Sequence, residues 1–156
     1  ATKSNIPINI LRLPMVYGPK SPGNFSFLVK WIEKNLPILL SESSERSFLA
    51  IDNLNEFIKE IVINKSNNSF EAILSDQNPI KIIDFLAAIK KNLNSHSLLL
   101  PVKNRLAKFL LSFFQISKLF YPLFHSFTIE PSELEEFNKD NLKSTEYYLD
   151  KYLKND

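Results

Sequence analysis

Glycine is almost absent from this chain, since only two of its 156 residues are glycine, where average usage gives roughly eleven. A dinucleotide-binding loop of the G-x-G-x-x-G type needs three glycines, and a P-loop needs two at a fixed spacing before Lys-Ser or Lys-Thr. Neither pattern occurs. Both glycines, Gly18 and Gly23, lie within residues 17–23, a loop rich in residues that break regular structure. The chain therefore cannot cradle a pyrophosphate in either of these two ways.

The rest of the composition excludes several other kinds of site. The chain has no cysteine, which removes disulfides, thiol nucleophiles, iron–sulfur clusters and cysteine zinc sites. It has two histidines, His96 and His125, and no H-E-x-x-H motif, so a histidine-rich metal site is not expected. Its 19 basic and 17 acidic residues leave a net charge of +2. That balance does not indicate nucleic acid as a partner.

The most apolar stretch covers residues 106–124 and is interrupted by Lys108, Gln115, Lys118 and Pro122. These interruptions argue against a transmembrane span. One alternative is an amphipathic helix that lies on a membrane surface or a partner helix. We prefer a buried or lid helix, because aromatic stripes at helical spacing usually pack into cores. The polar start of the chain shows no signal peptide, and the expected location is cytoplasmic.

Hydrophobic patterning predicts strands that alternate with helices. Short apolar runs predict strands at residues 6–13, 38–40, 46–51, 69–75 and 96–102. Apolar residues three and four apart, and segments of helix-forming composition, predict helices at 25–35, 52–64, 80–93, 103–121 and 144–154. A short extended piece at 126–130 and a short helix capped by Ser132 complete the pattern. The alternation argues for an α/β fold, although the strands are too few to build a doubly wound sheet alone.

Polar residues mark the expected helix starts. Asn24 is placed to be the N-cap of the helix at 25–35. Asp52 or Asn53 is expected to cap the helix at 52–64, and Asn53-x-x-Glu56 fits a capping box. These assignments need no ligand.

Two groups of titratable side chains have plain structural explanations. Both histidines have a serine neighbour, but a sequence neighbour is no evidence of triad geometry. Glu133, Glu135 and Glu136 lie on the short polar helix, where a solvated face explains them better than paired glycosidase carboxylates.

Two segments together form a more specific pattern. The first reads L-R-x-P-x-V-Y-G-P over residues 11–19 and is followed by Gly23-Asn24 at the start of a helix. The second reads R-x-F-x-x-x-D-N-L over residues 46–54. In this order they resemble the C-terminal half of the extended short-chain dehydrogenase/reductase family, the NAD-dependent sugar-nucleotide epimerases and dehydratases. UDP-sugar 4-epimerases are the most similar members, and the resemblance is clearest over residues 6–65.

The resemblance implies roles for the first segment. Pro14 and Met15 would follow the strand beside the active site, where their backbone would face the nicotinamide end of the cofactor. Met15 would also contact the substrate. Tyr17 and Gly18 would shape the substrate loop, Tyr17 as a substrate contact and Gly18 as a structural residue.

The resemblance also implies roles for three residues further along. Asn24 would contact the sugar nucleotide at a helix N-terminus. Arg46 would clamp the diphosphate, to which its planar fork is suited. Asp52 would cap a helix and fix the loop that carries Arg46. Asn24 and Asp52 are equally well explained as N-caps without a ligand.

The chain departs from the family in one important respect. The Gly-rich cofactor loop and the catalytic Tyr-x-x-x-Lys motif, which the family carries upstream of this region, are not found here. Tyr147 and Lys151 have the spacing of that motif, but they lie near the C-terminus with no dinucleotide site before them, and we interpret the spacing as chance. No catalytic residue is therefore assigned, and the chain alone is expected neither to bind NAD tightly nor to turn over substrate.

The expected architecture is the C-terminal part of a Rossmann-type enzyme with a mostly helical substrate-binding subdomain. Within a single unit, residues 1–23 would end the sheet and form the substrate loop, and residues 24–156 would bind the sugar nucleotide. The implied partners are a UDP-sugar, an NAD-binding half and a second copy of the chain, but neither nucleic acid nor a membrane surface. The alternative function is a non-catalytic interaction module that uses residues 106–124.

Overall fold

The computed structural model describes residues 8–64, 69–76, 78–103, 121–130 and 142–154. Its strands are β1 Asn9–Arg12, β2 Met15–Tyr17, β3 Ile38–Ser41, β4 Glu45–Arg46, β5 Phe48–Ala50, β6 Phe70–Ile73, β7 Ile80–Lys81 and β8 Leu99–Val102. Its helices are α1 Asn24–Glu33, α2 Ile51–Asn64, α3 Ile82–Asn92 and α6 Thr145–Leu153, with a 3-10 turn, η1, at Tyr121–Leu123. This order of strands and helices confirms the predicted α/β class.

The strands of the described residues associate in pairs, most of them parallel. β1 lies beside β6, β2 beside β5 and β3 beside β8 in parallel, whereas β4 and β7 are antiparallel. Beyond β6 the chain passes from one pair to the next. Leu74 donates its N–H to the carbonyl oxygen of Arg12 at 3.1 Å, and Asp76 then donates to that of Phe48 at 2.8 Å. The segment after β6 therefore joins the β1 strand to the β5 strand.

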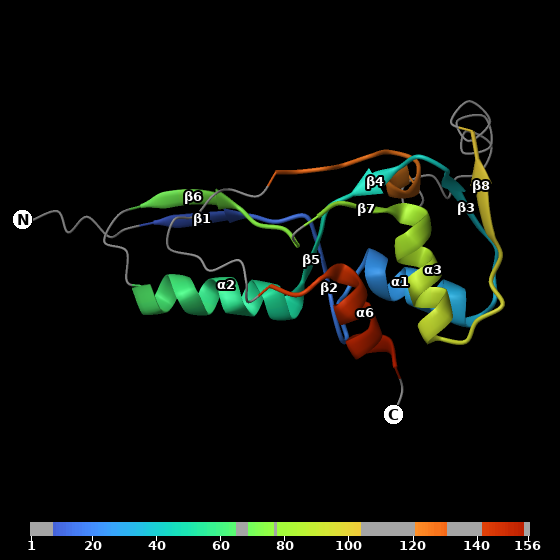
Figure 1. The fold of residues 1–156 in the computed structure, drawn as a ribbon, viewed down its shortest axis with the longest axis horizontal. Coiled ribbons are helices and arrows are strands. Elements are labelled where there is room, and N and C mark those ends of the chain that lie inside the picture. The colour runs from blue at the N-terminus through green and yellow to red at the C-terminus, as the bar shows by residue number, and fades with distance from the viewer. Residues whose placement is uncertain (1–7, 65–68, 77, 104–120, 131–141, 155–156) are drawn as a thin grey trace, which may run out of the picture.

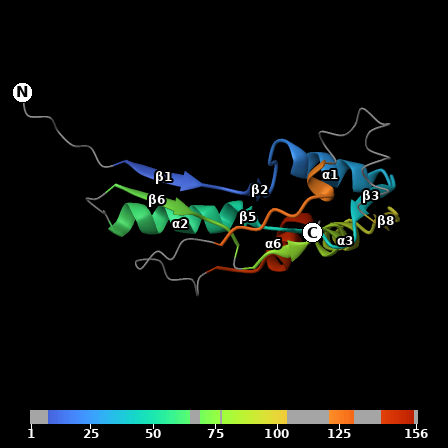
Figure 2. The same cartoon turned by 90° about the horizontal axis from the view of Figure 1, so that it is seen from above.

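The molecule is elongated, with different elements at its two ends. Figure 1 shows α2 lying along the β1–β6 pair, while α1, α3 and α6 gather at the other end with β3 and β8. The view from above keeps the same grouping (Figure 2). The strands β2 and β5 lie between the two ends and connect them.

Two clusters of buried apolar side chains correspond to this arrangement. The larger cluster holds Tyr17, Phe25, Phe48 and Phe85 together with residues of α1, α3 and α6. The rings of Phe48 and Phe85 stack with their centroids 4.1 Å apart, and each fully buried ring contributes about 1.5–3 kcal/mol. The smaller cluster lies between α2 and β6 and contains Leu49, Phe57, Ala72, Leu74 and Leu142.

The start of α1 differs from the prediction. Asn24 is the first residue of the helix, and the N-cap is Gly23, which has a φ of 86° and makes no side-chain capping bond. Glycine adopts this left-handed conformation without steric cost because it has no Cβ. The prediction that Asn24 caps the helix was therefore wrong, and its side chain is exposed.

The start of α2 also differs from the prediction. The helix begins at Ile51, so Asp52 and Asn53 both lie inside it, and Asp52 belongs to its first turn. Asn53 is fully buried, and its amide nitrogen donates to Asp76 Oδ1 at 2.7 Å and to the carbonyl oxygen of Lys143 at 3.1 Å. The predicted capping box was wrong, because the side chain of Asn53 is hydrogen-bonded to residues far away in the sequence.

Several predicted boundaries changed. Within the predicted strand at 6–13 the structure shows β1, Asn9–Arg12, and Pro14, which has no N–H to continue a ladder, separates it from β2, a strand that the sequence did not predict. The predicted strand at 46–51 is divided between β4 and β5, and the predicted helix at 80–93 begins as strand β7 before α3. The strand at 38–40 and the extended piece at 126–130 were predicted correctly.

Some predictions lie outside the described residues. These are most of the helix at 103–121, the helix capped by Ser132 with its three glutamates, and residues 106–120 of the apolar stretch. At the end of that stretch, Leu123 and Phe124 are buried in the core. None of the helices in the described ranges combines the length and the apolar character needed to cross a membrane.

Candidate functional site

Arg46 is held in β4 by a segment from late in the chain. Its side chain is half-buried, and its Nη1 donates to the carbonyl oxygens of Pro122 and His125, each at 3.1 Å. The guanidinium carbon lies 5.3 Å from the ring centroid of Phe127. Residues 122–127 therefore surround the guanidinium group on more than one side.

Backbone pairing fixes this segment beside β4. Phe127 donates its N–H to Glu45, and Ser47 donates to the carbonyl oxygen of Phe127, both at 2.9 Å. The N–H of Ile129 then donates to Ser47 Oγ at 3.0 Å. The position of Arg46 thus depends on residues about eighty positions away, which no local pattern could indicate.

The charge of Arg46 is not neutralised within the described part of the chain, where no carboxylate lies within 4.0 Å of it. Burial lowers the pKa of Arg46, but a guanidinium remains protonated in proteins. Its partners among the described residues are neutral carbonyl oxygens and an aromatic ring. A half-buried cation of this kind favours an anionic ligand, and its planar donors suit a phosphate.

The β2–β5 ladder places Met15 opposite a residue that is close to Arg46 in the sequence. Met15 pairs in register with Phe48, which lies two residues after Arg46. Pro14 and Met15 are both half-buried. The structure therefore places Met15 opposite the strand that follows Arg46 in the sequence, and Pro14 just before β2. The predicted contacts of these three residues with cofactor and substrate remain predictions.

Tyr17 lies in the core rather than on a surface. Its side chain is fully buried and its ring contacts Phe25 and Phe85, at centroid distances of 5.7 and 5.8 Å. Its hydroxyl donates to Asp76 Oδ2 at 2.9 Å. Burial, and then the charge of Asp76, raises the pKa of Tyr17. Contact with a substrate would require this side chain to leave the core.

Asp76 is the centre of a buried polar network that the sequence did not reveal. Besides Tyr17, it accepts hydrogen bonds from Ala50 N–H at 3.0 Å, Asn53 Nδ2 at 2.7 Å and Thr145 Oγ1 at 2.9 Å. These donors come from β2, β5, α2 and α6. Burial raises the pKa of Asp76, and its hydrogen bonds oppose that shift. In the sequence Asp76 looks like an ordinary turn residue before Pro79.

Gly18 and Asp52 lie where the end of β2 meets the start of α2. A Cβ on Gly18 would overlap the side chain of Ile51, so the absence of a side chain permits this close approach. Asp52 Oδ2 accepts from Lys151 Nζ at 2.5 Å, and the N–H of Asp52 donates to the hydroxyl of Tyr152 at 3.3 Å. These contacts give Gly18 and Asp52 packing roles and attach α6 to α2.

Tyr147 and Lys151, the pair with dehydrogenase spacing, point to different partners. Lys151 pairs with Asp52, which raises the pKa of the lysine. Its Nζ lies 5.7 Å from the ring centroid of Tyr148, not Tyr147. Tyr147 itself is 52% exposed. The ion pair with Asp52 suits a helix-docking role, whereas the contact with Tyr148 lies within α6.

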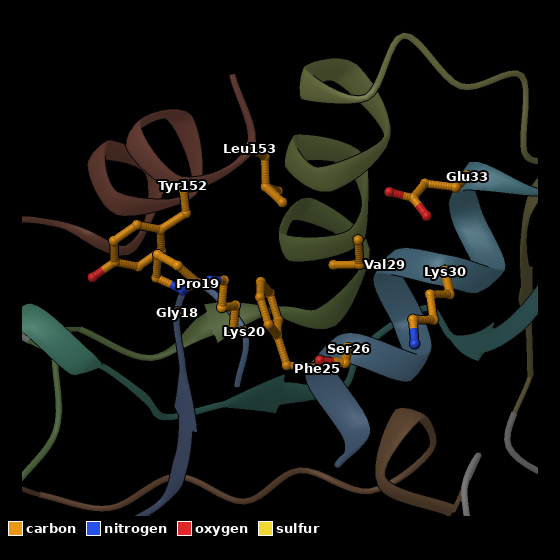
Figure 3. A pocket seen from close by; sticks show the side chains of 10 residues that line it. All are labelled: Gly18, Pro19, Lys20, Phe25, Ser26, Val29, Lys30, Glu33, Tyr152 and Leu153. Atoms are coloured by element: carbon orange, nitrogen blue, oxygen red, sulfur yellow. The ribbon is translucent and has the colours of Figure 1, made fainter. Parts of the chain in front are cut away.

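A separate cavity of about 180 Å³ opens between the loop after β2, α1 and α6 (Figure 3). Of the predicted site residues, Gly18 alone lines it, and Arg46, Asn24, Met15 and Tyr17 do not. The predicted residues therefore do not gather at one place, since Arg46 lies in β4, Tyr17 in the core and Gly18 in the wall of this cavity. Among the described residues, no group of three or more His, Asp and Glu side chains could hold a metal ion.

No protein-family model matches the chain, and no curated protein matches it. Solved structures do. The dTDP-4-dehydrorhamnose reductase of Bacillus anthracis, in complex with NADP, has a TM-score of 0.62 at 15% identity over 92% of this chain and 46% of its own. The UDP-N-acetylglucosamine 4-epimerase of Bacillus cereus has a TM-score of 0.60 at 13% identity, over 97% of this chain and 45% of its own.

A third likeness is to a dTDP-4-dehydrorhamnose reductase of Clostridium acetobutylicum, with a TM-score of 0.65 at 11% identity over 92% of this chain and 47% of its own. The chain thus spans less than half the length of these three structures. At such identities the likeness concerns the fold alone. Nearly the whole chain folds like part of a Rossmann-type sugar-nucleotide reductase or epimerase, as the sequence predicted.

Proposed function

We propose that this chain is the sugar-nucleotide-binding part of an NAD(P)-dependent nucleotide-sugar enzyme, of the UDP-sugar 4-epimerase type. The observation that carries the proposal is the half-buried guanidinium of Arg46, whose charge no carboxylate of the described residues neutralises. In this proposal Arg46 binds the diphosphate and Met15, which pairs in register with Phe48 two residues after Arg46, contacts the substrate. Asn24, exposed in the first turn of α1, contacts the same ligand.

The residues of this chain do not fit a dinucleotide. The close approach of Gly18 serves packing against Ile51, and Gly23 opens α1 outside any G-x-G-x-x-G pattern. We therefore propose that NAD(P) is bound by another part of the enzyme. The chain alone then neither binds the cofactor tightly nor turns over substrate.

The open edge of β1 supports this division. In the described residues β1 pairs with β6 alone, and Ile8 and Ile10 are 65% and 48% exposed. Parallel strands are normally buried on both faces within larger sheets. In this proposal residues 1–23 end a larger sheet that continues into the NAD(P)-binding half, and residues 24–156 bind the sugar nucleotide.

Calorimetric titration with UDP and UDP-glucose tests the nucleotide site. We expect Arg46→Ala to weaken UDP binding about 10- to 100-fold, the loss of one charged hydrogen-bonding group. Arg46→Lys should recover only part of that loss, because an ammonium lacks the planar fork. Arg12→Ala is the matched control, since Arg12 pairs with Glu71 on the surface of the β1–β6 pair.

Circular dichroism should accompany the titration, because Arg46 also holds residues 122–127. A folded Arg46→Ala protein that binds UDP as well as the unmodified chain does would contradict the proposal. So would an equal loss of binding in Arg12→Ala.

A further inference from the structure

The cavity beside Gly18 is open to solvent, and its lining combines apolar side chains with charged ones. Figure 3 shows side chains that approach it from three elements: Lys20 from the loop after β2, Phe25 and Val29 from α1, and Leu153 from α6. Phe25 and Leu153 are buried and Val29 is half-buried. The volume of about 180 Å³ exceeds the roughly 150 Å³ of an apolar cavity that binds benzene.

Lys20 reaches this cavity from a strained turn. Ser21 donates its N–H to the carbonyl oxygen of Gly18 at 3.1 Å, which closes a four-residue turn with Pro19 and Lys20 at its centre. Lys20 has a φ of 59°. Proline followed by a residue with positive φ is the pattern of a type II turn, in which glycine is favoured at the position that lysine occupies here. Strain of this kind is often found at ligand-binding sites.

The turn is also fixed to α1, because Ser26 Oγ donates to the carbonyl oxygen of Ser21. The turn that carries Lys20 is therefore held against the first turn of α1, which forms another wall of the cavity. A second cation, Lys30, lines the cavity from α1, as does Glu33. Within the described ranges none of these three groups lies within 4.0 Å of an opposite charge. The two cations outnumber the one anion at the rim.

We propose that this cavity binds a small aromatic carboxylate, with the ring between Phe25, Val29 and Leu153 and the carboxylate at Lys20 and Lys30. The apolar walls and the volume suit one six-membered ring, and the excess of positive charge at the rim selects an anion. The site goes beyond the proposed function, because neither Arg46 nor Met15 lines it. A ligand in this cavity would bind in addition to a nucleotide at Arg46.

Benzoate is the probe, and benzylamine is the comparison of similar size and opposite charge. Titration followed by protein NMR should show saturable shifts at the amides of Gly18, Ser26 and Leu153 with benzoate. Benzylamine should bind at least about tenfold more weakly, as expected when an attractive charged contact becomes repulsive. Equal binding of the two compounds, or no saturable shifts at these amides, would overturn the proposal.

The Lys20→Gly variant separates binding from folding. Glycine relieves the positive φ, so the midpoint of thermal unfolding should rise or stay unchanged, while benzoate affinity falls about tenfold with the loss of the ammonium. Lys34→Ala is the control, since Lys34 follows α1 outside the cavity. Unchanged benzoate affinity in Lys20→Gly would contradict the proposal, as would an equal loss in Lys34→Ala.

Two further variants test whether benzoate binds in this cavity rather than elsewhere on the protein. Val29→Phe adds a ring to the cavity wall and should abolish the benzoate shifts in a folded protein. Arg46→Ala should leave benzoate affinity unchanged, so failure of the nucleotide site and failure of this cavity are distinguishable. Benzoate binding that survives in folded Val29→Phe would place the ligand elsewhere and overturn the proposal.

Discussion

At the scale of single residues, Asp76 is the side chain on which most of the tertiary structure converges. It is 3% exposed, and its carboxylate accepts hydrogen bonds from four residues on four elements. Two opposing effects act on it. Burial disfavours the charged form, whereas each donor favours it. The balance raises the pKa of Asp76 above its ordinary value.

The raised pKa makes a prediction about stability. Between the ordinary pKa near 4 and the raised value, the folded state binds more protons than the unfolded state, so the free energy of unfolding should fall as pH rises. We expect the difference in this free energy between the unmodified chain and Asp76→Asn to fall over that window, by about 1.4 kcal/mol per pKa unit. Urea unfolding from pH 4 to 8 measures it. A difference that rises with pH would mean that the donors outweigh burial.

At the scale of elements, α6 is attached by polar contacts that span the chain. Thr145 Oγ1 donates to Asp76, Lys151 pairs with Asp52, and Asn92 Nδ2 donates to Asp150 Oδ1 at 2.9 Å. The buried residues of α6, among them Leu149, form the apolar part of its interface with the rest of the chain. The surface ion pair is worth little, so the buried contact of Thr145 should matter more to the docking of α6.

Thr145→Val tests this ranking, because it removes the hydroxyl and keeps the shape. The variant leaves Asp76 with one donor fewer and should lose about 1–3 kcal/mol of unfolding free energy. Hydrogen exchange of the α6 amides should speed up accordingly. Thr128→Val, at an exposed threonine, is the control. Equal effects of the two substitutions would show that the buried hydrogen bond does not hold α6.

At the scale of the whole molecule, the two ends differ in how completely they are covered. The end with α1, α3 and α6 encloses the larger core, although Leu98 and Leu100 near β8 are exposed there, and the end with β1, β6 and α2 also exposes apolar side chains. Among them are Ile8 and Ile10 beside the open edge of β1, and Val62 and Ile63 at 64% and 62% exposure on α2. An open apolar strand edge is a template for association with another chain.

We therefore expect the isolated chain to self-associate through β1 at micromolar concentration. Ile10→Lys should shift the population toward monomer, because a charge on an edge strand blocks pairing. Ile63→Lys changes a more exposed apolar residue away from the strand edge and should nevertheless have a smaller effect. Sedimentation equilibrium measures both. A chain that is monomeric without substitution would contradict this expectation.

The two helix starts show where local patterns stop being informative. Asn24 and Asn53 are both good N-cap residues, yet neither caps its helix. At α1 the chain needed a positive φ, which Gly23 supplies. At α2 the side chain of Asn53 is engaged by Asp76, 23 residues away. A capping preference of about 1 kcal/mol is readily outweighed by a buried hydrogen-bond network.

The sequence by itself determined the α/β class and where most strands and helices lie, because hydrophobic period is a local property that each segment carries alone. It also indicated Arg46 and the loop with both glycines. Only the tertiary structure decided what surrounds them: the carbonyl oxygens of Pro122 and His125 around Arg46, and the cavity beside Gly18. Such contacts join residues dozens of positions apart, and buried polar groups take whatever partners folding brings to them.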